Sequence, residues 1–424
     1  MNHILSYLLI ALSLLSCNLP TETLSTGELQ EGPWRMEFDL GDEKLPFNFM
    51  LEQTNNSYHI KVTNAEEVIE ITDIVRKGDS LFASLPVFDS EFKGLIKDTQ
   101  SFVGYWHNYA KGKNYKIPFT AIHGKNYRFL EKDPVSAADF GGKWEVTFGS
   151  SNDPEEVCKA IGLFNQSGHE VTGTFITETG DYRFLEGCVC DDTLFLSCFD
   201  GSHAFLFKAI QNKEGTIQGD FWSGNHWHEP WTGIRNDSFA LTHPDSLTYL
   251  KEGYDKLSFR FPDLNGDSVT LENERYRNKV VIVQIMGSWC PNCADETNLY
   301  ADLFRKYHDK GLEIVALAYE KGEDFERNRE KVIKMKDFFG AEYDFLLAGK
   351  AGKSYASQTL PMLNHVMSYP TSIFIDRSGK IRKIHTGFYG PGTGNIYIEY
   401  VEETQMFLEK LLNEPLPDQM AASN

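Results

Sequence analysis

Two cysteines separated by two residues stand at the point where a buried strand is predicted to meet a helix. Residues 280–285 read Val-Val-Ile-Val-Gln-Ile, a run that is typical of a central strand covered on both faces. Cys290 and Cys293 follow, and apolar residues then recur at helical spacing over 299–307. We therefore expect Cys290 to be exposed at a helix N-terminus, where the helix dipole favours a thiolate, and Cys293 to be shielded one turn later.

Four motifs occur in order between residues 257 and 415. They are a predicted hairpin at 261–269, the sequence Trp289-Cys290-Pro291-Asn292-Cys293, an acid at Glu296, and the sequence Tyr369-Pro370-Thr371 at the start of an apolar strand. A lone Cys-x-x-Cys motif is weak support for any family, whereas four motifs in register are specific. Together they resemble the thioredoxin fold of the TlpA/ResA-like thiol–disulfide oxidoreductases.

The resemblance implies a role for three residues of the first helix. Cys290 is expected to be the nucleophile and Cys293 the resolving thiol that closes the internal disulfide. Glu296 would lie one turn from Cys293 in a partly desolvated place, where its pKa is raised and it can carry the resolving proton. The alternative for Glu296 is an exposed acid in the first turn, favoured there by the helix dipole.

The proline loop is expected to form the substrate side of the site. The resemblance implies that Pro370 is cis and faces the cysteine pair, so that the backbone before it can pair with an extended substrate. Tyr369 is bulkier than the residue expected there, and we expect it to narrow the set of partners. The residues expected to contact substrate are Trp289, Pro291, Asn292, Tyr369 and Thr371. We expect no cofactor and no metal, since Pro370 would occupy the place of further ligands.

The N-terminus carries a predicted export signal. Residues 4–15 are apolar but too few to span a bilayer, which is typical of a signal peptide. The sequence Leu14-Leu15-Ser16-Cys17 resembles a bacterial lipobox, so residues 1–17 are interpreted as a lipoprotein signal peptide and Cys17 as the lipidated residue. The alternative is an ordinary cleaved signal peptide with an incidental cysteine. Residues 18–30 are polar and are interpreted as a tether.

Two similar stretches lie between this tether and the cysteine pair. Residues 31–130 and 138–236 show period-two alternation with turn signals, and short sequences recur between them at a nearly constant offset. We expect two tandem all-β modules, each a meander closed as a small barrel or sandwich. Residues 237–256 are interpreted as a linker to an α/β thioredoxin fold at 257–415.

Three cysteines of the second stretch leave two interpretations open. Cys188 and Cys190 would point to one face of a strand, and either could reach Cys198 across a hairpin. A structural disulfide is compatible with an exported protein. Buried free thiols are the alternative.

The chain of 424 residues has a net charge of −20, which argues against a nucleic-acid partner. The motifs favour a thiol–disulfide oxidoreductase that acts on disulfides of exported proteins in the reducing direction. It would be lipid-anchored in a bacterial cell envelope, face the periplasm and receive electrons from a membrane-bound donor. The alternative is a lipoprotein whose β modules bind an envelope ligand, with the redox domain ancillary.

Overall fold

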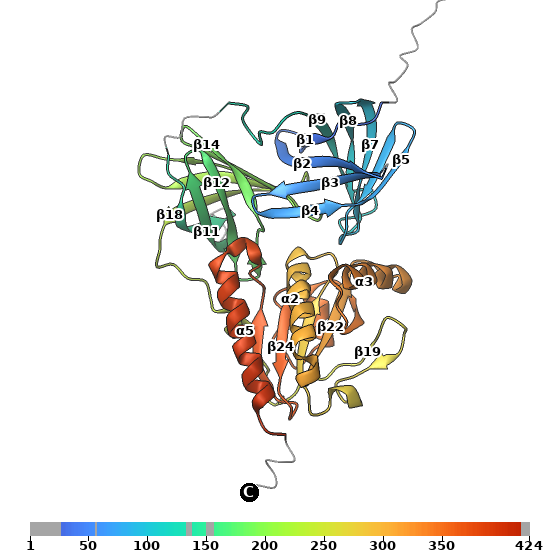
Figure 1. Cartoon of the computed structure of the whole chain (residues 1–424). Coiled ribbons are helices and arrows are strands. Elements are labelled where there is room, and N and C mark those ends of the chain that lie inside the picture. The colour runs from blue at the N-terminus through green and yellow to red at the C-terminus, as the bar shows by residue number, and fades with distance from the viewer. Residues whose placement is uncertain (1–26, 56, 133–137, 150–156, 417–424) are drawn as a thin grey trace, which may run out of the picture.

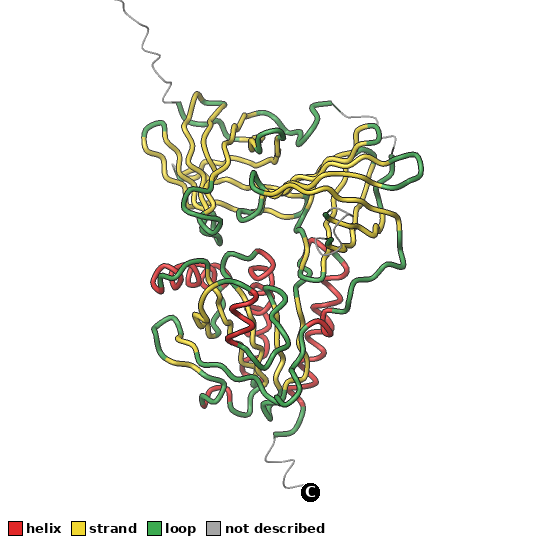
Figure 2. The backbone as a smooth tube through the Cα atoms, turned by 180° about the vertical axis from the view of Figure 1, so that it is seen from behind, coloured by secondary structure: helices red, strands yellow, loops and turns green. Residues whose placement is uncertain are grey.

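The computed structural model describes residues 27–55, 57–132, 138–149 and 157–416. Cys17 and the predicted signal peptide lie outside these residues. Two β modules stand side by side above a C-terminal domain of helices and strands (Figure 1). Figure 2 shows the same arrangement from behind. Within the described part of the chain, no helix has the length and apolar character needed to cross a bilayer.

The first module is one nine-stranded antiparallel sheet with strand order β4-β3-β2-β1-β9-β8-β7-β6-β5. Alternate residues of β1, among them Trp34, Met36 and Phe38, are buried and pack into the module's own core. The sheet curls until β3 and β5 approach each other, so the module is a nearly closed barrel. Its strands are β1 (Gly32–Asp39), β2 (Lys44–Thr54), β3 (Ser57–Asn64), β4 (Glu67–Ile71), β5 (Asp73–Lys77), β6 (Ser80–Ser84), β7 (Ser90–Asp98), β8 (Ser101–Asn108) and β9 (Lys116–His123).

The second module has the strand order β11-β10-β18-β17-β16-β15-β14-β12-β13, and β11 also pairs with β12. That pairing closes the sheet into a barrel around a core rich in aromatic rings. The predicted all-β meander barrels are thus confirmed. The strands are β10 (Gly142–Phe148), β11 (Cys158–Ser167), β12 (Glu170–Thr177), β13 (Gly180–Asp181), β14 (Leu185–Cys190), β15 (Thr193–Phe199), β16 (Ala204–Gln211), β17 (Ile217–Ser223) and β18 (Trp227–Arg235).

The C-terminal domain is built on a five-stranded sheet of order β23-β22-β21-β24-β25. Strand β21 is buried along its whole length and pairs in parallel with β22 and antiparallel with β24, as a central strand should. This mixed sheet with flanking helices is the predicted thioredoxin fold. The strands are β19 (Phe261–Pro262), β20 (Ser268–Val269), β21 (Val280–Met286), β22 (Leu312–Glu320), β23 (Asp344–Lys350), β24 (Thr371–Ile375) and β25 (Ile381–Thr386).

Helices cover the sheet and mark the connection to the β modules. Helix α1 (Pro244–Leu247) contacts β25, so the segment after the second module runs alongside the C-terminal domain. The other helices are α2 (Pro291–Tyr307), α3 (Phe325–Phe339), α4 (Lys353–Thr359) and α5 (Asn395–Asn413), with short 3₁₀ turns η1 (Glu274–Tyr276), η2 (His308–Lys310) and η3 (Pro391–Thr393).

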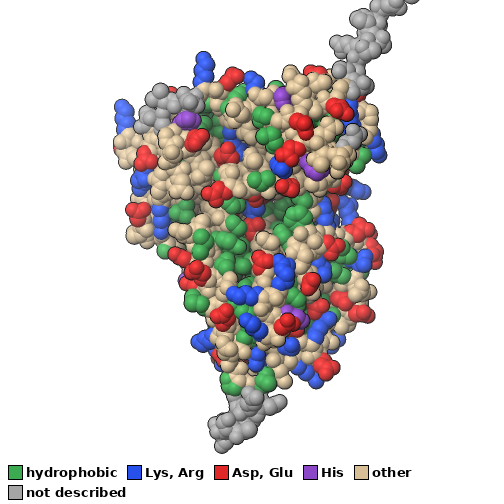
Figure 3. Space-filling view, viewed as in Figure 1, with side chains coloured by type: hydrophobic (Ala, Val, Ile, Leu, Met, Phe, Trp, Pro, Cys, Tyr) green, Lys and Arg blue, Asp and Glu red, His purple; other side chains and the backbone are tan. Residues whose placement is uncertain are grey.

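The first module docks on α3 through the loop between β6 and β7. Val87 and Phe88 of this loop are buried and belong to the apolar core of the C-terminal domain. Lys334 of α3 donates to the carbonyl oxygens of Leu85 at 2.6 Å and of Phe88 at 3.0 Å. Hydrophobic side chains also gather at the level where the modules meet the C-terminal domain (Figure 3). The modules and the redox domain therefore share buried surface.

Candidate redox site

The two cysteines lie at the junction of β21 and α2. Cys290 is the N-cap of α2, and its Sγ accepts a hydrogen bond from the backbone N–H of Cys293 at 3.3 Å. Pro291 occupies the first helical position, where its missing N–H costs no hydrogen bond. The sulfur of Cys290 thus faces a backbone N–H group at the positive end of the helix dipole.

The expected exposure of Cys290 is wrong. Its exposed fraction is 7%, and Cys293 is fully buried. The Cys290 thiol lies 3.4 Å from the carbonyl oxygen of Tyr369, to which it donates. The tyrosine ring packs edge-on against Trp289, with the ring centroids 5.5 Å apart. Both the proline loop and the second β module cover this corner of the helix, and a cover formed by a distant module cannot be deduced from a local motif.

The proline loop faces the cysteines as the resemblance implied. The Tyr369–Pro370 peptide bond is cis. Thr371 is buried, and its hydroxyl donates to the carbonyl of Ser368 at 2.9 Å, so its side chain holds the loop together. Trp289 and Asn292 are partly exposed at the rim of the site.

Glu296 is fully buried between α2 and the sheet. Its carboxylate accepts hydrogen bonds from Gln284 and Ser372, each at 2.9 Å. Burial raises the pKa of Glu296 to about 7, although these two hydrogen bonds oppose the shift. This burial excludes the alternative of an exposed first-turn glutamate. A carboxyl with a pKa near neutrality can both take up and release a proton at physiological pH.

Cys293 is held in its protonated form. Burial is the main cause that raises the pKa of Cys293, and the hydrogen bond to Cys290 and the negative charge of Glu296 raise it further. A thiol in this state needs a base before it can attack a disulfide. Glu296 is on the same helix one turn away, and its charge is close enough to affect the Cys293 thiol.

Two polar residues of the site were not singled out from the sequence. Glu320, at the end of β22, accepts hydrogen bonds from the backbone N–H of Ser288 at 2.7 Å and from its hydroxyl at 2.6 Å. Burial raises the pKa of Glu320, and the two bonds from Ser288 oppose that shift. Gln284 positions Glu296. Gln284 could have been singled out from the sequence, because it is the polar residue in the otherwise apolar run of β21.

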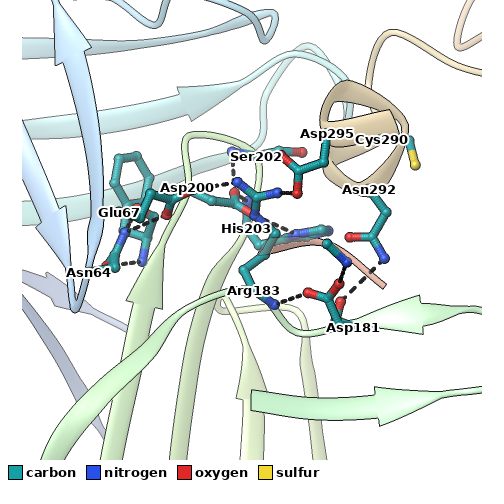
Figure 4. Close-up of polar contacts among 12 residues, drawn as sticks. Asn64, Glu67, Asp181, Arg183, Asp200, Ser202, His203, Cys290, Asn292 and Asp295 are labelled. Carbon is teal, nitrogen blue, oxygen red and sulfur yellow. Dashed lines mark hydrogen bonds and ion pairs between the residues drawn. The ribbon is translucent and has the colours of Figure 1, made fainter. Parts of the chain in front are cut away.

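A buried arginine joins both β modules to the redox helix (Figure 4). Arg183 of the second module forms ion pairs with Glu67 of the first module and with Asp295 of α2. The Asp200 carboxylate lies 3.9 Å from the Arg183 Nε. The sulfur of Cys290 points away from this cluster. The cluster therefore fixes the start of α2 without contacting the reacting atom.

Three further contacts place the second module against the edge of the site. The Ser202 hydroxyl donates to the carbonyl of Trp289 at 3.1 Å, and the Ser368 hydroxyl donates to the carbonyl of Thr179 at 2.8 Å. The Asn292 amide lies so close to Gly180 that a Cβ there would stand 1.9 Å from its Nδ2 atom. The β12–β13 turn thus forms a wall beside both the cysteine motif and the proline loop, which the sequence did not indicate.

The remaining described cysteines are free thiols. Cys188 lies opposite Phe195 and Cys190 opposite Thr193 in the register of β14 and β15, so neither faces Cys198. Of the two interpretations left open by the sequence, the free thiols are correct. Among the described residues, no three His, Cys, Asp or Glu side chains are grouped so that they could hold a metal ion.

Comparisons with known proteins agree with this geometry. Residues 251–395 match the Redoxin family. The thiol-disulfide oxidoreductase ResA of Bacillus thuringiensis subsp. konkukian is 30% identical over 132 residues, which cover 31% of this chain and 68% of the relative. The thioredoxin-like protein YneN of Bacillus subtilis is 27% identical over 139 residues, covering 32% of this chain and 73% of the relative.

A solved thiol-disulfide oxidoreductase from Bacteroides fragilis is also similar, with 17% identity and a TM-score of 0.26. The match covers 35% of this chain and 99% of that structure. The residues that match the Redoxin family include the cysteine pair, the buried glutamate and the cis-proline loop. The chain therefore belongs to the ResA-like thiol–disulfide oxidoreductases and is an oxidoreductase of that family.

Proposed function

We propose that this protein reduces disulfide bonds in exported proteins of a bacterial cell envelope. One observation carries the proposal: the Cys290 sulfur lies between the N–H of Cys293 and the carbonyl that precedes the cis-proline. At this point the sulfur accepts a hydrogen bond from the start of the helix and is next to a backbone segment that can pair with an extended chain.

The reaction transfers two electrons from the protein to the substrate. The Cys290 thiolate attacks one sulfur of the substrate disulfide, which forms a mixed disulfide and releases the first substrate thiolate. Cys293 then loses its proton and attacks the Cys290 sulfur, which releases the second substrate thiolate and leaves a Cys290–Cys293 disulfide. The substrate is reduced by two electrons and the cysteine pair is oxidised by two.

Glu296 supplies the base for the second step. Its pKa of about 7 leaves a fraction of the carboxylate ionised at neutral pH, and this form takes the proton of the Cys293 thiol. Trp289, Pro291, Asn292 and Tyr369 border the place where the mixed disulfide forms. Tyr369 fills the space beside Trp289, so it restricts which chains can approach Cys290.

The cellular setting of the proposal comes from the sequence. The lipobox-like Leu14-Leu15-Ser16-Cys17 supports a lipid anchor at Cys17. A lipid-anchored reductase that faces the periplasm needs a membrane-bound thiol donor to return the Cys290–Cys293 disulfide to its dithiol form. Attachment at Cys17 can be tested by metabolic labelling with a fatty acid, with Cys17→Ser as the control.

The proposed activity is tested by insulin reduction with dithiothreitol as the electron source. The wild-type protein should accelerate the reduction, and Cys290→Ser should abolish the acceleration, whereas Cys158→Ser should leave it unchanged because Cys158 lies on β11 of the second module. In cells, Cys293→Ala should accumulate Cys290-linked mixed disulfides with exported proteins. An absence of thiol-dependent turnover together with an absence of adducts would favour the ligand-binding role of the β modules.

A further inference from the structure

Two lysines from different parts of the chain reach the Trp289 side of the redox site. Lys321 directly follows β22, and its Nζ atom lies 4.3 Å from the centroid of the Trp289 ring. Its side chain is exposed at the surface. This amine therefore stands next to the residue that precedes the nucleophilic cysteine.

Lys111 approaches the same edge from the first β module. It lies in the turn after β8, where its N–H donates to the carbonyl of Asn108 at 3.2 Å. The Asn108 amide donates to the carbonyl of Ser202 at 2.8 Å, and the Ser202 hydroxyl donates to the carbonyl of Trp289 at 3.1 Å. These contacts fix the Lys111 turn at the rim of the site.

The charge of Lys321 acts on the Lys111 amine. Burial and, after it, this charge lower the pKa of Lys111 to about 8, and the charge of Asp200 opposes the shift. Burial also lowers the pKa of Lys321. Lys111 is half-buried and Lys321 is exposed, so both side chains are accessible to solvent. Two like charges brought together in this way are unfavourable unless an anion joins them.

Among the described residues, neither amine forms an ion pair with a carboxylate. The charge of Asp200 acts on Lys111 and that of Glu320 on Lys321, but these carboxylates bind His203 and Ser288. The Lys111 amine forms a hydrogen bond with the Nε2 atom of His226, at 3.1 Å. Burial and the charge of Lys111 lower the pKa of His226 to about 4, so this ring is neutral and accepts the bond.

We propose that Lys111 and Lys321 bind a carboxylate of the substrate, so that the protein prefers disulfides flanked by acidic residues. This inference rests on the proposed reductase function and adds a substrate class to it. The chain as a whole carries a net charge of −20, so most of its surface repels an acidic substrate. A pair of cations beside the reacting sulfur therefore directs the acidic segment of a substrate to this place.

A different role for Lys321 makes a different prediction. The charge of Cys290 acts on the Lys321 amine, so Lys321 can also act on the reacting sulfur itself. Loss of that effect would slow the reaction with every disulfide by the same factor. Loss of substrate binding would slow the reaction with acidic substrates alone. The discrimination between two matched substrates therefore separates the two roles.

The test uses two synthetic peptides that share one intramolecular disulfide and differ only in two residues beside a cysteine, which are Glu in one and Gln in the other. Single-turnover oxidation of the pre-reduced protein is followed by its tryptophan fluorescence. The wild-type protein should react about tenfold faster with the Glu peptide, the factor expected for one charge-assisted contact. Lys111→Gln/Lys321→Gln should remove this preference, and Lys111→Glu/Lys321→Glu should reverse it. Lys213→Gln/Lys410→Gln, a double variant at two exposed positions outside the site that changes the net charge by the same amount, should retain it.

Equal rates of the wild-type protein with both peptides, or an unchanged preference in Lys111→Gln/Lys321→Gln, would overturn the substrate preference while leaving the reductase function intact. Failure of the wild-type protein to react with either peptide would instead contradict the reductase function. Raised salt should reduce the preference for the Glu peptide, since the contact is between charges at a partly exposed surface.

Discussion

Arg183 of the second β module forms an ion pair with Asp295, which stands two residues after Cys293 in the redox helix. Arg183 also pairs with Glu67 of the first module, so one guanidinium joins the three parts of the fold. The exposed fraction of Arg183 is 9%, and its backbone adopts φ +64°, a conformation that is uncommon for a residue other than glycine. The structure thus maintains a costly conformation where the modules meet the site.

Replacement of Arg183 by Met should destabilise the protein strongly. The change leaves the Glu67 and Asp295 side chains, which are 11% and 17% exposed, without their cation, and breaking a buried pair in this way typically costs about 3–5 kcal/mol. Urea unfolding should report this decrease in the free energy of unfolding. Arg275→Met is the matched control, because Arg275 and its partner Asp344 are 43% and 30% exposed, and an exposed pair contributes about 0–1 kcal/mol. Similar losses in the two variants would contradict a special role of the buried pair.

Glu296→Gln should change how the stability of the protein depends on pH. The pKa of Glu296 is about 7 in the folded protein and near its ordinary value of 4.5 in the unfolded chain. The folded state therefore binds the proton more tightly, and the stability from this group is complete below pH 4.5 and lost as pH rises to 7. The difference is about 3 kcal/mol, and it should disappear from the unfolding free energy of the Gln variant.

The same variant should affect the two halves of the reaction differently. Without a carboxylate beside Cys293, the release of a Cys290 mixed disulfide should slow by about a hundredfold, the lower range for general base catalysis. The initial attack by Cys290 should be little changed. Quenched-flow separation of mixed disulfide from product measures both steps. An unchanged release step would remove Glu296 from the proton transfer.

Ser372→Ala should move the titration of Glu296 upward. The Ser372 hydroxyl donates to the Glu296 carboxylate at 2.9 Å and lowers its pKa, so removal of this bond should raise the pKa above about 7. The pH profile of the release step should shift to higher pH by the same amount. Ser357→Ala in α4 is a suitable control, because its hydroxyl bonds the backbone away from Glu296.

Gly180→Ala should loosen the cover over the cysteine pair. A Cβ at this position would stand 1.9 Å from the Asn292 side chain, so the β12–β13 turn or Asn292 must shift. The rate of alkylation of Cys290 by iodoacetamide should rise severalfold, because Cys290 is only 7% exposed in the intact site. Gly168→Ala is the control: Gly168 also has a positive φ, but a Cβ there meets no atom within 4 Å. Equal alkylation rates in the two variants would mean that the turn does not limit access.

The redox motif could be predicted from the sequence because its geometry is local. The positions of Cys290, Cys293 and Glu296 follow from one strand and the first two turns of one helix, and the spacing alone places them on one face. The tandem β modules were also predictable, since alternation of buried residues repeats along their strands. The closure of the second barrel through β11 and β12 follows from the pairing of the strands.

The burial of Cys290 could not be predicted in the same way. Its cover depends on contacts between residues far apart in the sequence, such as Ser202 with Trp289, 87 positions apart, and Thr179 with Ser368, 189 positions apart. Serine and threonine at these positions carry no local signal, because such residues are common in any surface turn. The sequence likewise gives no indication of the Arg183 cluster, since the partners of Arg183 come from three separate segments. Contacts of this kind appear only once the modules are docked.

The loop that carries Val87 and Phe88 determines whether the C-terminal domain has a complete core without the first module. These two side chains complete the apolar core of a domain to which they do not belong in sequence, and the amine of Lys334 holds the loop in place. A C-terminal domain produced without the first module would expose to water the apolar surface that Val87 and Phe88 cover, so it would tend to self-associate. The first β module therefore supplies part of the core of the redox domain and is not an independent carrier. A module that replaced it by recombination would need apolar side chains that fit the same surface.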